Sequence, residues 1–144
     1  MTESVLLELD GVGEVVVDPE ASYVRISVQG DAADPGLRQL LEVAFEAVVA
    51  RRLRYTVVDT SGITGRPSIE YLQRLEDMLP VMVRAGCRAQ FSVLPRTSGL
   101  VGLNMRTFLA QQREHGIATF QVAAVVEAVR AIEELNRSEA VVGT

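Results

Sequence analysis

Hydrophobic and polar positions in the N-terminal third of the chain have the pattern of β-strands, first as short apolar runs and then as a regular alternation. Apolar residues dominate Val5–Leu9 and Glu14–Val17, and Tyr23–Gln29 alternates regularly between apolar and polar side chains. We therefore predict strands at these positions, with Tyr23–Gln29 paired in a hairpin to Glu14–Val17. The alternation also indicates that one face of the hairpin is open or partly open. The residues expected on the buried face are Val24, Ile26 and Val28.

A helical period replaces this alternation after Gly30. Asp34 and Pro35 are residue types preferred at the N-cap and the first position of a helix. The apolar positions that follow recur at helical spacing and predict one buried stripe. They are Leu37, Leu40, Leu41, Ala44, Phe45 and Val48.

Short apolar runs and helical patterns then alternate towards the end of the chain. The apolar runs predict strands at Tyr55–Asp59, Ala89–Leu94 and Ile117–Phe120, with a loop at Pro95–Ser98. The helical patterns cover Ile69–Ala85, Leu100–Glu114 and Val122–Leu135.

Two of these helices have a clear apolar face. Pro80 predicts a kink or a break inside Ile69–Ala85, and Gly86 predicts its end. The residues expected to face inward are Leu72, Leu75, Leu79 and Met82 in that helix, and Val125, Val126, Val129, Ile132 and Leu135 in the last one.

The order of elements predicts one α/β domain. We expect a mixed sheet of about five to six strands, with an N-terminal hairpin, parallel central strands joined by right-handed crossovers, and about four helices. The pattern leaves open whether helices cover one face of the sheet or both. We predict that residues 1–136 form this domain and that 137–144 form a flexible C-terminal tail.

Charge and composition narrow the class of partner. The formal net charge of −5 disfavours nucleic acid and anionic membranes as partners, since both favour a basic surface. The single cysteine, Cys87, has no internal disulfide partner, and no apolar run approaches the ~20 residues that span a bilayer. The first residues do not resemble a signal peptide. We therefore predict a cytoplasmic protein that neither binds nucleic acid nor inserts into a membrane.

The segment from Val57 to Ser68 carries a family resemblance. Its sequence, VVDTSGITGRPS, resembles the strand, small-residue turn and helix start of STAS domains, and most of all the SpoIIAA-like, STAS/SEC14-type bacterial proteins. The runs Gly99–Met105 and Ala128–Leu135 are also similar to that group. The resemblance spans Glu14–Leu135. It implies a SpoIIAA/STAS-like fold and a non-enzymatic regulatory module without a cofactor, whose partner is a regulator or an anti-sigma-type kinase.

The resemblance assigns Ser68 to the phosphorylation switch of anti-sigma-factor antagonists. It implies a partner-binding or switch site formed by Ser68, Asp59, Ser61 and Thr64. Pro67 stands where the family has an aspartate, and Ile69 and Glu70 replace small residues. The residue pattern also supports a second interpretation, in which Ser68 is the N-cap of the following helix.

Two other positions have alternative interpretations as well. Asp59 is either a ligand or acid–base group, or a turn residue that accepts backbone N–H bonds from Ser61 or Gly62. The loop containing Arg96, Thr97, Ser98 and Gly99 either holds an anion or ligand at the carboxyl edge of the sheet, or simply caps the next helix. The SEC14 side of the resemblance implies an alternative function, small-molecule or lipid binding, in a groove near Arg96–Gly102 and Pro80.

The remaining reactive residues do not predict an enzyme. Ser68, His115 and Asp59 contain the residue types of a catalytic triad, but the G-x-S-x-G motif of a nucleophile elbow is absent. His115 suits a helix C-terminus, and Cys87 suits a buried position. One histidine and one cysteine do not make a usual zinc site. A homodimer formed through the hairpin, or through the helix that carries Met78 and Met82, is compatible with each function.

Overall fold

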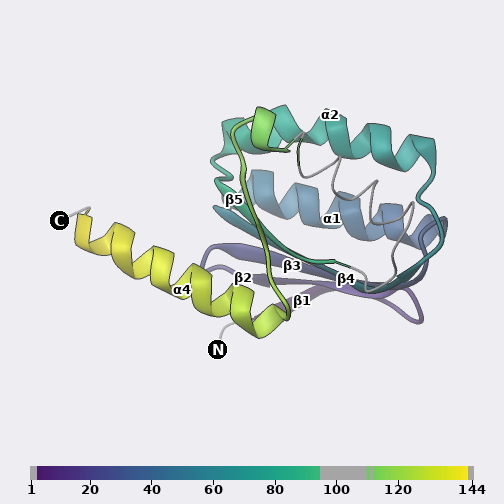
Figure 1. Cartoon of the computed structure of the whole chain (residues 1–144), viewed down its shortest axis with the longest axis horizontal. Coiled ribbons are helices and arrows are strands. Elements are labelled where there is room, and N and C mark those ends of the chain that lie inside the picture. The colour runs from purple at the N-terminus through teal and green to yellow at the C-terminus, as the bar shows by residue number, and fades with distance from the viewer. Residues whose placement is uncertain (1–2, 95–109, 111, 143–144) are drawn as a thin grey trace.

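The computed structural model describes residues 3–94, 110 and 112–142, which form a six-stranded sheet with helices on both faces (Figure 1). The strands are β1 (Ser4–Leu9), β2 (Gly13–Asp18), β3 (Tyr23–Asp31), β4 (Tyr55–Thr64), β5 (Ala89–Val93) and β6 (Ala118–Gln121). The helices are α1 (Pro35–Arg51), α2 (Ile69–Ala85) and α4 (Val125–Val142). The expected loop at Pro95–Ser98 and most of the expected helix Leu100–Glu114 lie outside the described residues.

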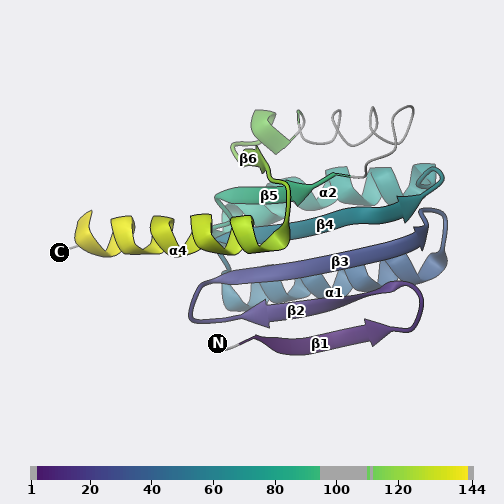
Figure 2. The same ribbon diagram turned by 60° about the horizontal axis from the view of Figure 1, so that its bottom comes forward.

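The order of strands in the sheet is the order of strands in the chain. β1, β2 and β3 pair antiparallel, whereas β3 to β6 pair parallel, which confirms the predicted mixed sheet and its N-terminal hairpin. The connections through α1 and α2 both step in the same direction across the sheet, so both helices cover the same face. α4 follows the last strand and crosses the opposite face (Figure 2).

Each face of the sheet has its own hydrophobic core. On the first face, α1 packs on the alternate apolar residues of β2 and β3, including Val15, Val17 and Val24. On the second face, Ala128 and Ile132 of α4 are fully buried. The strand residues beneath them are Tyr23, Tyr55, Val57, Ala89 and Phe91. β4 and β5 are therefore covered on both sides along this part of the sheet.

The second face of β2 and β3 is partly open, as the alternation predicted. Arg25 lies there in a polar network, and its guanidinium donates to Glu14 Oε1 at 3.1 Å and to Ser27 Oγ at 2.9 Å. Glu3 also pairs with Arg25. These pairs neutralise the charge of Arg25, although its buried Nε has no hydrogen-bond partner among the described residues.

β4 is longer than its apolar run predicted. The predicted end of this strand at Asp59 was wrong, because the strand continues to Thr64. The small-residue turn that the resemblance implied therefore does not follow Asp59 directly. β3 is correspondingly longer and reaches Asp31, which pairs with Thr64. A shift of register after Ser27 brings these polar segments into line. Pairing between the two strands, rather than the apolar content of either, therefore determines where β4 ends.

The ends of α1 and α2 follow the predicted capping residues. The Asp34 side chain accepts a hydrogen bond from Gly36 N at 2.8 Å. α2 ends at Gly86, whose φ is +108°, and Cys87 N donates to Met82 O in the pattern of a Schellman motif. α2 is continuous through Pro80, so the predicted alternative of a break does not occur.

α4 is longer than predicted and rotated relative to the predicted inner face. It runs to Val142 rather than Leu135, and Val126 and Leu135 are exposed by 54% and 37%. Polar contacts explain the added length: Asn136 donates to Ala21 O at 2.8 Å, and Glu139 pairs with Arg54 and Arg88. The domain boundary at residue 136 stays a prediction, although the chain is helical beyond it. Within the described residues, no helix is long and apolar enough to cross a membrane.

Cys87 is buried between the end of α2 and the start of β5, and burial raises the pKa of its thiol to about 11. We expect a thiol reagent at neutral pH to modify it only in molecules that open, because the reactive thiolate is disfavoured in the fold. The measurement is the rate of Cys87 labelling as denaturant is raised, compared with the unfolding equilibrium. Rapid labelling of the native protein, at the rate of a free thiol, would contradict this burial.

Candidate functional site

The residues that the sequence grouped at the junction of β4 and α2 lie on two different faces of the sheet. Thr56, Val58 and Thr60 line a pocket beneath α2. Because strand side chains alternate, Asp59 lies on the opposite face, where it and Ser61 line a shallow cleft. Ser68 begins α2, on the first face. Of the predicted set of Ser68, Asp59, Ser61 and Thr64, Asp59 and Ser61 therefore lie on the face opposite Ser68.

Asp59 makes local hydrogen bonds. Its Oδ1 accepts from Ser61 N at 3.0 Å and from Ser61 Oγ at 2.6 Å, as the structural interpretation of this residue predicted. Glu8, Asp10 and Glu14 line the same cleft. Across the part of the chain that the structure describes, no group of three or more His, Cys, Asp or Glu residues is placed to hold a metal ion.

Ser68 is the N-cap of α2. Its Oγ accepts from Tyr71 N at 3.1 Å, which confirms the capping interpretation, while phosphorylation of this residue stays a prediction. Ile69, the next residue, is 82% exposed. Thr64 lies at the end of β4, where its Oγ1 donates to Gly30 O at 3.2 Å. The first turn of α2 thus presents a hydroxyl group and a large apolar side chain together to solvent.

The remaining predicted positions are the loop after β5, His115 and the triad partners of Asp59. Arg96, Thr97, Ser98 and Gly99 lie outside the described residues. His115 is exposed after a helical turn that ends at Glu114. Asp59 binds Ser61 rather than a histidine, so the triad arrangement is not formed.

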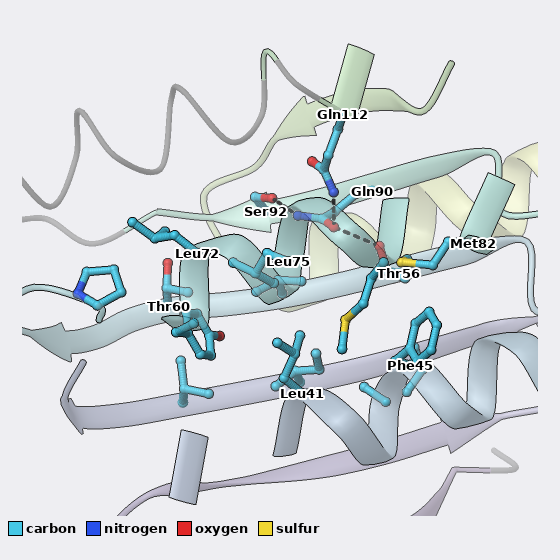
Figure 3. A pocket seen from close by; sticks show the side chains of 18 of the residues that line it. Leu41, Phe45, Thr56, Thr60, Leu72, Leu75, Met82, Gln90, Ser92 and Gln112 are labelled. Carbon is cyan, nitrogen blue, oxygen red and sulfur yellow. Dashed lines mark hydrogen bonds between the residues drawn. The ribbon is translucent and has the colours of Figure 1, made fainter. Parts of the chain in front are cut away.

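A pocket of about 90 Å³ lies between α1, α2 and the sheet (Figure 3). Its walls are apolar side chains of both helices, and α2 contributes residues that are only half-buried. Leu72, Leu75 and Met82 face inward, as sequence patterning predicted, and they line this pocket. The labelled wall residues in the figure are Leu41, Phe45, Leu72, Leu75 and Met82.

Buried polar side chains of β4 and β5 form the floor of the pocket. Gln90 Oε1 accepts from Thr56 Oγ1 at 3.1 Å and from Gln112 Nε2 at 2.6 Å. Gln90 Nε2 donates to Ser92 Oγ at 3.1 Å. Each of these side chains is at least nine-tenths buried, and Gln112 is only 1% exposed. Gln112 Oε1 has no hydrogen-bond partner within the described part of the chain.

Sequence analysis missed this polar floor, although a signal was present. Gln90 and Ser92 alternate with Phe91 and Val93 in a strand expected to lie at the centre of a parallel sheet. A polar residue on a covered face of such a strand must find a buried partner. That requirement predicts a polar cluster, but the alternation alone does not identify Gln112 as one of its members.

An ion pair joins α1 to α2 beside the pocket. Arg74 donates to Glu42 through Nε at 2.6 Å and through a terminal nitrogen at 3.0 Å. This pairing holds the pKa of Glu42 below its usual value. The same guanidinium lies 5.3 Å from the centre of the Phe45 ring.

Burial raises the pKa of Tyr71 to about 12, so this pocket residue is a neutral phenol at physiological pH.

The sheet order and the arrangement of helices define an α/β fold of the SpoIIAA/STAS type. Among solved structures, SiaC of Pseudomonas aeruginosa is similar to this chain, with a TM-score of 0.51 and 13% sequence identity; the match covers 85% of this chain and 98% of SiaC. At this identity the likeness shows the fold alone. No protein-family model matches the sequence, and no curated protein matches it.

Proposed function

We propose that this chain is a non-enzymatic regulatory module that binds a protein partner through the first turn of α2. The observation that carries the proposal is the exposure of Ile69, which is 82%, directly after the cap residue Ser68. A large aliphatic residue at a helix start contributes little to the fold when it is exposed. The same residue gains much from burial against a partner.

Ser68 is the proposed control point of this surface. Its side chain is exposed, and its Oγ accepts only the capping bond from Tyr71 N in the described contacts. A phosphate at this position would place negative charge at the positive end of the helix and next to Glu70. Its arrival would change the charge that a partner meets, and the resemblance to anti-sigma-factor antagonists suggests a regulator or kinase as that partner.

A comparison of variants in affinity capture from the native host tests the docking surface. We expect Ile69→Asp to reduce recovery of the partner at least about tenfold, because it removes the apolar contact at its centre. Ser68→Glu is expected to change recovery in the same assay. The matched control is Val126→Asp, which alters an apolar residue that is 54% exposed on α4, on the other face.

The control variant distinguishes a specific docking surface from nonspecific hydrophobic binding. If Ile69→Asp recovers the same proteins in the same amounts as the unaltered chain, the first turn of α2 is not the docking site. Equal losses for Ile69→Asp and Val126→Asp would have the same meaning. Quantitative mass spectrometry of the captured fractions provides the comparison.

A second candidate function is the binding of a small molecule or lipid, supported by the apolar pocket beneath α2. This pocket lies between the two helices on the first face of the sheet. The sequence analysis expected a groove near Arg96–Gly102 and Pro80, and the first of these segments lies outside the described residues. Binding there is compatible with a partner on the first turn of α2, because Tyr71 and Leu72 line the pocket, whereas Ser68 and Ile69 do not. A homodimer stays a prediction, to be tested by sedimentation at micromolar concentration.

A further inference from the structure

The carbonyl oxygen of Gln112, which has no partner among the described residues, indicates that the pocket is a binding site with apolar walls and one polar end. Buried polar atoms without a partner destabilise a fold and are uncommon in native proteins. Gln112 lines the pocket, and its Nε2 is already engaged by Gln90. The amide therefore has one hydrogen-bonding end free at the upper end of the pocket, where Figure 3 shows it.

The charge of the lining restricts the ligand. None of the described residues that line the pocket is charged at neutral pH, and Tyr71 remains a neutral phenol. A carboxylate or phosphate would lose its hydration there without gaining a countercharge. The site therefore suits a neutral molecule.

The size of the pocket restricts the ligand further. An apolar cavity of about 150 Å³ holds benzene, so 90 Å³ takes roughly four non-hydrogen atoms before any wall moves. Met78 and Met82 are among the walls, and methionine side chains adapt easily to a guest. A short aliphatic chain fits this space better than an aromatic ring.

We propose that the pocket binds an aliphatic molecule with a hydroxyl group, either a short alcohol or the hydroxyl-bearing inner end of a longer chain. The hydroxyl lies against the Gln112 amide, and the carbon chain packs on Leu75, Met78 and Met82. A hydroxyl group both donates and accepts, so it satisfies whichever end of the amide faces it. The inference deepens the small-molecule candidate and is independent of partner docking at Ile69.

A single buried water on Gln112 is the competing occupant, because one water also satisfies an amide. Water and an aliphatic alcohol differ in how much binding free energy each gains from the apolar walls. Only the alcohol gains from contact with Leu75 and the methionines. Its binding must therefore depend on both the amide and the free space.

Titration with two probes of similar size tests the proposal. The probes are 1-butanol and 1-chlorobutane. Their binding is followed through the amide chemical shifts in two-dimensional NMR spectra of the full chain. In a purely apolar cavity 1-chlorobutane would bind better than 1-butanol, because water solvates 1-chlorobutane less well. We expect 1-butanol to bind tighter by about three- to tenfold, because it alone donates to the amide. The shifts are expected at pocket residues of α2 and β5.

Two variants show where the preference comes from. Gln112→Met keeps the side-chain length but removes the amide, and we expect it to abolish the preference for 1-butanol. Leu75→Phe fills the space, and we expect it to abolish binding of both probes. Both variants are accepted for comparison only if their spectra remain dispersed like those of the unaltered chain.

The possible failures are distinguishable. Binding of both probes in the pocket with no preference for 1-butanol, or with a preference that Gln112→Met leaves intact, overturns the role of the hydroxyl but leaves small-molecule binding. If neither probe shifts the pocket resonances, water alone occupies the site. That result overturns both the role of the hydroxyl and small-molecule binding. If Gln112→Met does not fold, the Leu75→Phe variant and the two-probe comparison on the unaltered chain still decide the result.

Discussion

Replacement of Gly13 by alanine is expected to lower the free energy of unfolding by about 3 kcal/mol. Gly13 opens β2 at the point where the chain leaves the first hairpin turn. A Cβ atom built there would lie 2.1 Å from the carbonyl oxygen of Ser27 and 3.0 Å from Leu40 Cδ1. The leucine side chain has room to turn, but the carbonyl belongs to the neighbouring strand. Relief of that contact requires β2 and β3 to separate, which weakens their hydrogen bonds.

Gly11→Ala provides the matched control in the same turn. Gly11 has a φ of +74°, yet a Cβ there meets nothing within 4 Å. The variant should lose only about 1 kcal/mol, the cost of a left-handed conformation for alanine. Urea unfolding of both variants, followed by circular dichroism, measures the difference. Equal losses would show that backbone conformation, and not contact with Ser27, makes glycine necessary at residue 13.

Gln90→Met is expected to lower the free energy of unfolding by about 2–3 kcal/mol. Gln90 accepts from Thr56 and Gln112 and donates to Ser92, so it is the centre of the polar floor. Methionine has nearly the same length but supplies neither an amide donor nor a carbonyl acceptor. The Gln112 amide then has both of its ends buried without a partner, and this desolvation accounts for most of the loss.

The double variant separates hydrogen bonding from packing. When both partners of a buried hydrogen bond are replaced by apolar groups of similar shape, much of the loss is recovered. Gln90→Met with Gln112→Met should therefore be more stable than Gln90→Met alone. The control, Thr60→Val, removes one bond to Val93 O and should cost about 1 kcal/mol. Strictly additive losses in the double variant would mean that Gln90 and Gln112 are not energetically coupled.

Much of the fold was predictable because it follows from residue period and capping. The strand Tyr23–Gln29, the cap Asp34 and the helix Ile69–Ala85 each carry a local signal, and the structure confirms them. The extension of β4 to Thr64 was not predictable in this way, since it depends on pairing with Asp31 of another strand. The same is true of the last turns of α4, which contact Arg54 and Ala21, far away in the sequence.

The candidate site was less predictable than the fold. The cap at Ser68 is local and was predicted, whereas the separation of Asp59 from Ser68 depends on which face of the sheet each one occupies. The pocket depends on the space left between α2 and the strands, which no local pattern encodes. Gln112 belongs to it only because its helix brings it beside Gln90, 22 positions earlier.

The agreement between strand order and chain order has a consequence for synthesis on the ribosome. Each strand from β2 to β6 pairs with the strand made just before it, so every new strand meets an edge that already exists. No early strand has to wait for a distant partner, and few closures of long loops slow the growth of the sheet. α4 is made after all six strands and is the element that covers Tyr55 and Phe91. The nascent chain therefore keeps that face of the sheet available to chaperones until α4 leaves the exit tunnel.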